Sequence, residues 1–262
     1  MHTIVLATQK GGSGKSTLAI GLALAAKQAG HNVRLLETDQ QGTLSNWQSR
    51  RGLAEPIVES VLNAGDIEHR LQSLTRGGVT VTIIDTAGGL SAATTAAIRY
   101  CDLCLIPTRP SVADIEATGS TLGIARAWKK AFAFVLNQTP IRGRRIDDAA
   151  TALGDGAARD LADVLARPFI AMRNDHQDAL AAGLAVGEYA PAGKSADEIR
   201  GLWQWAEARL NGGLIAREEL GSEAEPVEFP ILLMPTAEDA AEPAAPSPPG
   251  WREAAVSWDS GL

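Results

Sequence analysis

Cysteine and aromatic residues are scarce in this chain of 262 residues, which has two cysteines and an aromatic content of 5%. Two cysteines cannot build a disulfide framework, which suits a reducing compartment. Cys101 and Cys104 have a C-x-x-C spacing that invites a metal or redox interpretation. No second pair or nearby histidine supplies further ligands, and residues 102–106 read as a buried strand. We therefore expect two thiols packed in a core of Ala, Leu, Ile and Val.

Long apolar runs are missing as well. No run approaches the roughly 18 residues that a membrane-spanning helix needs, and the amino terminus lacks the charged and apolar regions of a signal peptide. We expect a cytoplasmic protein with no membrane partner.

Negative charge is concentrated at one end of the chain. The net charge is −7, but residues 213–262 hold ten acidic and two basic residues, so residues 1–212 carry about +1. Seven of the 13 prolines also lie after residue 212. The sequence predicts a folded domain over residues 1–212 and a flexible, acidic, proline-rich tail over residues 213–262. Two apolar islands in the tail, Val227–Met234 and Trp251–Trp258, are either partner-binding motifs or plain linker.

A glycine-rich segment, KGGSGKST at residues 10–17, stands between an apolar run, Thr3–Ala7, and a helix-like run, Leu18–Ala29. A strand, a glycine-rich turn and a helix in this order predict a phosphate-binding loop. The glycines let successive N–H groups converge on an anion, and the first helical turn adds free N–H groups. Lys15 can reach the β- and γ-phosphates, and the Ser16 hydroxyl is placed to ligate Mg²⁺. The candidate nucleotide-binding residues are Gly11, Gly12, Ser13, Gly14, Lys15, Ser16 and Thr17.

Two acidic residues follow apolar strands. Asp85 ends the run Val79–Asp85 and can hold Mg²⁺ directly or through a water molecule. Asp39 lies just past the strand Val33–Leu36, on the edge where parallel α/β proteins bind ligands. The alternatives are a plain acid at a strand end for Asp85 and a helix cap for Asp39.

The loop departs from the common G-x-x-x-x-G-K-[ST] pattern, because Gln9 replaces the first glycine and an extra lysine, Lys10, follows. This form resembles the deviant Walker A motif of the ParA/MinD family of P-loop ATPases. Two further stretches, 35–42 and 81–86, resemble the family's second motif and its Walker B strand. Within the family, the chain looks most like the small ParA proteins of the ParF type.

The resemblance implies the P-loop NTPase fold, an α/β fold with a mostly parallel, twisted sheet and helices on both faces. It also implies an ATPase of weak intrinsic activity that uses ATP and Mg²⁺ and forms an ATP-dependent homodimer. In that dimer Lys10 reaches the partner's phosphates, while Asp39 orients or activates the attacking water. Asn137 is implied to contact the adenine, although an asparagine after a strand is commonplace.

Relatives in the family bind DNA without sequence preference, and a ParB-like or other adaptor stimulates hydrolysis. The resemblance thus implies a nucleoid-associated protein that positions plasmid DNA, chromosomal DNA or another cargo. Arginines are the DNA-contact candidates, and the alternative is a solvated loop. They are Arg142, Arg144, Arg145 and Arg173.

The main rival is a membrane-associated positioning ATPase like MinD, which needs a basic amphipathic helix at its carboxyl end. An acidic, proline-rich tail argues against it. Other rivals are a metal-cluster carrier or amide-forming enzyme on the same loop, and a DNA-binding scaffold without enzymatic activity.

Between the motifs, the sequence predicts a helical connection over Val58–Leu74, a helix over Leu90–Tyr100 and one long helix over Val112–Lys130. The last helix is expected over Ala196–Leu210. It contains Trp203 and Trp205. Residues two positions apart do not lie on the same face of a helix, so we expect the two rings to point in different directions.

Overall fold

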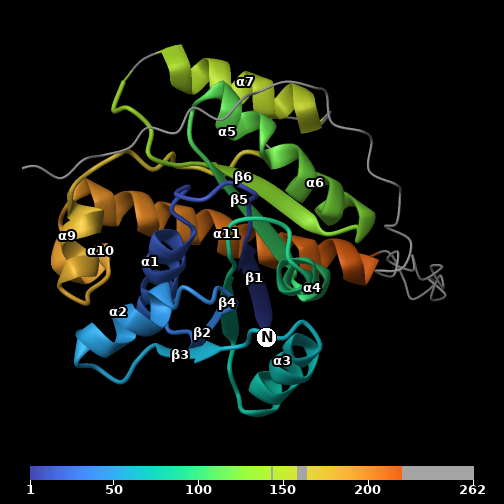
Figure 1. The fold of residues 1–262 in the computed structure, drawn as a ribbon, viewed down its shortest axis with the longest axis vertical. Helices are drawn as coiled ribbons and strands as arrows, with labels where there is room; N and C mark the ends of the chain where they lie inside the picture. Colours follow the sequence, from blue (N-terminus) through green and yellow to red (C-terminus); the bar gives the residue numbers. More distant parts are fainter. Residues whose placement is uncertain (143, 158–163, 220–262) are drawn as a thin grey trace, which may run out of the picture. The chain divides into compact units, whose positions relative to one another are not determined.

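Six parallel strands form one sheet in the computed structural model, which describes residues 1–142, 144–157 and 164–219 (Figure 1). The strands are β1 (His2–Leu6), β2 (Val33–Glu37), β3 (Ile57–Ser60), β4 (Val81–Asp85), β5 (Leu103–Thr108) and β6 (Ala131–Leu136). Their order is β3-β2-β4-β1-β5-β6, so β1 lies between β4 and β5. All parallel strands end at the same edge, which brings the segments after β1, β2, β4 and β6 to that edge.

Helices cover both faces of the sheet, and the strands inside the edge strand β3 carry apolar residues on both sides. One face carries α1 (Lys15–Gln28), α2 (Thr43–Arg51), α9 (Asp175–Ala181), α10 (Val186–Tyr189) and α11 (Lys194–Glu219). The other carries α3 (Asp66–Arg76), α4 (Ala92–Tyr100), α5 (Val112–Glu116), α6 (Thr118–Ala127) and α7 (Arg144–Ala157). Alternation along β1 shows the division: Ile4 and Leu6 pack under α1, whereas Val5 packs on the opposite face. This arrangement confirms the predicted fold class.

Two segments differ from the sequence prediction. Val58–Leu74 is not one helical connection, because Ile57–Ser60 forms the edge strand β3 and the helix α3 begins only at Asp66. Short apolar runs do not reveal by periodicity whether they are strand or helix. The predicted helix Val112–Lys130 is divided into α5 and α6 at Ala117. The Thr118 hydroxyl donates to the Ile115 carbonyl at 2.6 Å, a local bond of the kind that competes with the helical ladder.

Both cysteines are buried and free, as expected. Burial raises the pKa of Cys101 to about 12 and that of Cys104 well above its ordinary value, so both thiols are neutral at pH 7. No group of His, Cys, Asp and Glu residues that could hold a metal ion is found among the described residues.

The last helix is longer than predicted. The backbone of α11 is helical to Glu219, past the boundary at residue 212, and residues 220–262 lie outside the described residues, as do the two apolar islands. Trp203 is 3% exposed in the core, while Trp205 is only partly buried, so the two rings have different surroundings. None of the described helices is both long and apolar enough to cross a membrane.

The close approach of Gly183 to α2 gives a stability prediction. Gly183 has φ +71°, and a Cβ there would lie 2.7 Å from the backbone carbonyl carbon of Arg50 and the amide nitrogen of Arg51. We expect Gly183→Ala to lower the free energy of unfolding by about 2–4 kcal/mol through strain and overpacking. Gly30→Ala is the matched control, since Gly30 has φ +97° but a Cβ there would meet no atom within 4 Å. We expect Gly30→Ala to lower the free energy of unfolding, measured by urea unfolding, by only about 1 kcal/mol. Equal losses for both variants would contradict the packing argument.

Candidate functional site

Residues 10–17, the phosphate loop, come after β1 and include the first three residues of α1. Gly12 and Gly14 have positive φ values of 74° and 89°, a conformation that glycine adopts without strain. Gly14 is the residue immediately before α1, so the free N–H groups of the first helical turn face the same space as the loop. The hollow has a volume of about 500 Å³. It is lined by Gln9, Gly11, Gly12, Gly14, Lys15, Ser16, Thr17, Asp39, Gln41, Thr43, Thr86, Ala87 and Gly88.

Side-chain amides from the end of β6 hold the loop from behind. The buried Asn137 Nδ2 donates to the Ser13 carbonyl at 2.7 Å, and Gln138 Nε2 donates to the Gly12 carbonyl at 2.9 Å. A Cβ on Gly14 would lie 2.3 Å from Asn137 Nδ2, so only glycine fits at that position. The amide nitrogen of Asn137 is therefore committed to the loop, which leaves its Oδ1 for any ligand.

Lys15 supplies the positive charge at the floor of this hollow. Its side chain is mostly buried, and its Nζ lies 3.5 Å from the Lys10 carbonyl oxygen. Desolvation lowers the pKa of Lys15, and the carboxylates of Asp85 and Asp39 oppose that shift. Within the part of the chain that the structure describes, this long contact is the hydrogen bond that Lys15 makes, so its ammonium is available to a negatively charged ligand.

Asp85, at the end of β4, is fully buried. Neither of its carboxylate oxygens has a hydrogen-bond partner of good geometry among the described residues. Burial raises the pKa of Asp85 to about 7, although nearby Ser16 and Lys15 lower it. Two unsatisfied oxygens beside a serine hydroxyl fit a hard cation such as Mg²⁺, which prefers oxygen ligands. Ser16 and Asp85 would hold that ion, and the ion would neutralise phosphate charge.

Glu37 and Asp39 at the end of β2 have different surroundings. Glu37 is fully buried and accepts from the Leu44 amide at 2.6 Å and from the amide and hydroxyl of Ser45, so it caps α2. Asp39 is half-buried and accepts from the Gln41 amide at 2.9 Å. Asp39 therefore lines the phosphate hollow while Glu37 fixes the helix behind it.

A smaller hollow of about 120 Å³ adjoins the first and shares Gly14 and Thr17 with it. Asn137, Gln138, Met172 and His176 are among its other lining residues. His176 Nε2 is buried and has no hydrogen-bond partner among the described residues, and burial lowers the pKa of this ring. The sequence singled out Asn137 here but missed His176, because nothing local marks a lone histidine at the start of α9 as facing a cavity.

The four arginines that are candidates for DNA contact differ in their exposure and in their ion pairs. Arg142, Arg144 and Arg145 are exposed, the last two in the first turn of α7. Arg173 instead pairs with Glu198 at 2.6 Å and lines a hollow of about 550 Å³ that also contains Arg167 and Ile146. The structure thus leaves three arginines open to solvent and places the fourth in an ion pair.

Lys10 does not line the hollow in which Lys15 lies. Its Nζ forms an ion pair with Asp114 Oδ2 at 3.2 Å, and 37% of its side chain is exposed. Asp114 belongs to α5, beyond the end of β5. Of the two lysines in the phosphate loop, one therefore points to the hollow and the other to a neighbouring helix.

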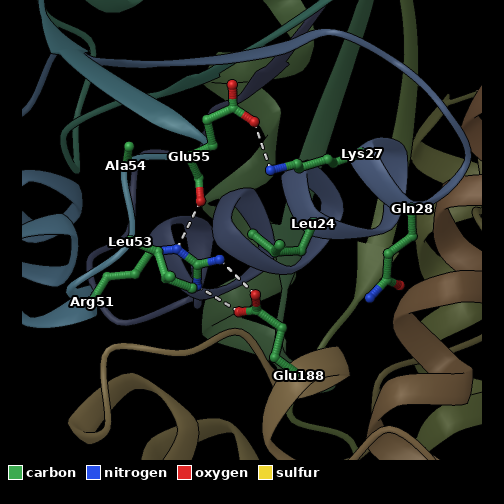
Figure 2. A pocket seen from close by; sticks show the side chains of 8 residues that line it. All are labelled: Leu24, Lys27, Gln28, Arg51, Leu53, Ala54, Glu55 and Glu188. Carbon is green, nitrogen blue, oxygen red and sulfur yellow. Dashed lines mark hydrogen bonds and ion pairs between the residues drawn. The ribbon is translucent and has the colours of Figure 1, made fainter.

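Another hollow of about 550 Å³ lies beside the second half of α1, and its charged groups are paired with one another (Figure 2). Arg51 binds both carboxylate oxygens of Glu188 at 2.5 Å, and Lys27 pairs with Glu55 at 2.6 Å. Because the cations of this hollow are already paired with carboxylates, they are poorly suited to bind a phosphate. The hollow beside the phosphate loop is the stronger candidate for a functional site.

The fold and this hollow define a P-loop nucleotide-binding protein. A family profile described as the CobQ/CobB/MinD/ParA nucleotide binding domain matches residues 4–186. The chain belongs to this family, which confirms the ParA/MinD resemblance.

Relatives and solved structures are consistent with that membership. A ParA protein of Rhizobium radiobacter is 33% identical over 124 residues, which are 47% of this chain and 55% of that protein. The chain thus spans about half the length of that relative. The maintenance of carboxysome distribution protein A of Halothiobacillus neapolitanus is 28% identical over 206 residues, 75% of this chain and 92% of that protein. The septum site-determining protein MinD of Pyrococcus horikoshii, solved with Mg-ADP, shares the fold with a TM-score of 0.63 and 18% identity, covering 81% of this chain and 98% of that one.

The pKa of Asp85 predicts a pH-dependent stability for the nucleotide-free protein. The folded state keeps a proton up to about pH 7 that the unfolded state has lost near pH 4, so stability falls as the pH rises between these values. We expect Asp85→Asn to be more stable than the wild type at pH 8, with an advantage about 1–3 kcal/mol larger than at pH 5. Urea unfolding at both pH values measures this difference. Asp155→Asn, on the exposed side of α7, should show no such change, and an equal response from both variants would contradict the assignment.

Proposed function

We propose that this chain is a ParA-type positioning ATPase. It binds ATP and Mg²⁺ at the phosphate loop, closes as a face-to-face homodimer, and then binds DNA without sequence preference. A ParB-like or other adaptor stimulates hydrolysis and releases the dimer from the nucleoid. The cargo is plasmid DNA, chromosomal DNA or a protein assembly. The similarity to the maintenance of carboxysome distribution protein A supports a protein assembly as much as a DNA cargo.

The proposal is supported above all by the different positions of the two lysines. Lys15 is buried at the floor of the phosphate hollow, whereas Lys10 lies at the surface next to it. A partly exposed ammonium beside the mouth of one site can reach the triphosphate of a second protomer placed against it. Charge that grows on the phosphates during hydrolysis would then be neutralised in trans, as an arginine finger does.

The remaining roles follow from the surroundings of each side chain. Lys15 and the loop amides bind the phosphates, and Ser16 with Asp85 would hold the metal ion. Asp39, half-buried and facing the hollow, orients or activates the attacking water. The nucleobase occupies the small hollow and donates a hydrogen bond to the Oδ1 atom of Asn137, whose Nδ2 is bound to the Ser13 carbonyl. Hydrolysis is slow in the separate protomer because its site lacks the Lys10 side chain of a second protomer.

Two variants test the catalytic roles. Asp39→Ala should keep ATP binding and accumulate an ATP-bound dimer, with hydrolysis lowered at least about 100-fold. Lys10→Ala should keep ATP binding but lose both the dimer and hydrolysis. Light scattering after gel filtration, together with phosphate release, measures both properties. Lys129→Ala, a change of an exposed lysine outside the site, serves as the control. Normal hydrolysis in Lys10→Ala would remove the trans role, and loss of ATP binding in Asp39→Ala would refute the role of Asp39.

DNA binding should require ATP and weaken steeply with salt. Each phosphate contact adds about 1 to the slope of log affinity against log salt, so Arg144→Glu with Arg145→Glu should reduce that slope by about 2. We also expect about a tenfold lower affinity for random duplex DNA in fluorescence anisotropy. Arg76→Glu on α3 is a single charge reversal away from this surface, half the charge change of the double variant, and should have little effect. An equal loss in Arg76→Glu would mean that general charge, and not this surface, explains the binding.

A further inference from the structure

The side chain of Glu37 closes residues 38–42 into a short loop. Glu37 is the last residue of β2, and the chain continues as α2 from Thr43. Its Oε1 accepts from the Leu44 amide at 2.6 Å, and its Oε2 accepts from the Ser45 amide at 3.2 Å and from the Ser45 hydroxyl. The carboxylate therefore ties the end of the strand to the first turn of the helix.

The start of α2 relies on this carboxylate for its acceptors. Gly42, which immediately precedes the helix, has φ +67° and no side chain that could cap it. The free N–H groups at the start of a helix need acceptors, and the helix dipole favours an anion there. Glu37 is 0% exposed and the Leu44 side chain is equally buried, so water does not take over this role. Loss of the carboxylate would leave buried donors unpaired, which is destabilising.

The strand end of the loop is fixed as well. The Thr38 amide and hydroxyl both donate to the Asp85 carbonyl, at 3.0 Å and 3.2 Å. The Val61 amide donates to the Glu37 carbonyl at 2.9 Å. Residues 39–43 thus form a short span between two fixed points, one at the sheet and one in the first turn of α2.

The side chains on this span face the phosphate hollow. Asp39, Gln41 and Thr43 all line it. The Asp39 carboxylate accepts from the Gln41 amide at 2.9 Å, and its carbonyl accepts from the Gly42 amide at 3.2 Å, so its position follows the conformation of the span. Glu37 is not among the described residues that line the hollow. It is therefore placed to act on a ligand through the residues that it holds.

We propose that Glu37 is a positioning residue that places the Asp39 carboxylate for the attack of water on the γ-phosphate. The inference rests on the proposed function, since it requires Asp39 to orient or activate that water. The capped start of α2 holds Asp39 at one distance and direction from the phosphate loop before nucleotide binds. A displacement of about 1 Å in such a group can slow a reaction about 100-fold.

Glu37→Gln tests the role in hydrolysis. The variant keeps the length of the side chain but replaces one acceptor oxygen by an NH₂ group, which cannot accept from the Leu44 or Ser45 donors. We expect single-turnover hydrolysis of ATP with Mg²⁺ by the full chain to be about 10- to 100-fold slower per bound nucleotide, with the Kd for ATP close to that of the wild type. A merely structural role would lower the amount of folded protein and not this rate. An unchanged rate, or a loss of ATP affinity as large as the loss of rate, overturns the proposal.

Ser45→Ala provides a milder variant that does not depend on the folding of Glu37→Gln. It removes one of the three donors and keeps the Glu37 charge, so a slower rate reports position and not charge. We expect hydrolysis to be about two- to fivefold slower. Ser49→Ala is the matched control, because Ser49 is an exposed serine one turn further along α2 whose hydroxyl donates to the Ser45 carbonyl at 2.9 Å. Equal rates in the two serine variants overturn the proposal.

Hydrogen exchange separates this inference from the proposed function. In nucleotide-free protein, the amides of residues 41–45 should exchange several-fold faster in Glu37→Gln than in the wild type. The last turn of α2, which Arg51 ties to Glu188, should exchange equally in both proteins. Equal exchange over residues 41–45 refutes the positioning role of Glu37 and leaves the proposed function intact. Normal hydrolysis in Asp39→Ala instead refutes the role of Asp39 in the proposed function, whatever the exchange rates are.

Discussion

The contact between Asn137 and the phosphate loop is the constraint on which the site depends. Its amide at the end of β6 donates to the Ser13 carbonyl, and it lies where a side chain on Gly14 would be. The loop is therefore shaped from behind by a residue 124 positions away from Ser13 in the sequence. Because the loop carbonyls are occupied in this way, its N–H groups are free to face an anion, and the site exists before any nucleotide arrives.

Two ionisable groups in the site are buried without full compensation. Lys15 is largely desolvated with one long polar contact, and Asp85 is buried with no good hydrogen bond among the described residues. Each is costly by itself. Together they indicate the kind of ligand that suits the site, since an anion satisfies the lysine and a divalent cation satisfies the aspartate. Glu37 shows the contrast, because it is equally buried but is satisfied by the amino end of α2 and has no need of a ligand.

The sequence predicts the strand, the glycine-rich turn and the helix at the start of the chain well, because residue types close together in the sequence favour each of them. In the structure Gly12 and Gly14 stand between β1 and α1 with positive φ values, in the order that the sequence predicts. The prediction is wrong for the edge strand β3, because its pairing with β2 is not visible in a run of four residues. His176 and the Lys10–Asp114 pair could not be predicted, since each depends on segments that only the folded sheet brings together.

The order of the strands also bears on how the protein is made. β1 pairs with β4 and β5, whose residues lie about 80 and 100 positions later in the chain. The phosphate loop leaves the ribosome early, yet its neighbours Asp85 and Asn137 are synthesised much later. Long-range pairing of this kind slows folding and leaves apolar strands unpaired during synthesis. The first strand therefore has no partner in the sheet until β4 has emerged, and the phosphate loop lacks the Asn137 amide behind it until β6 has emerged.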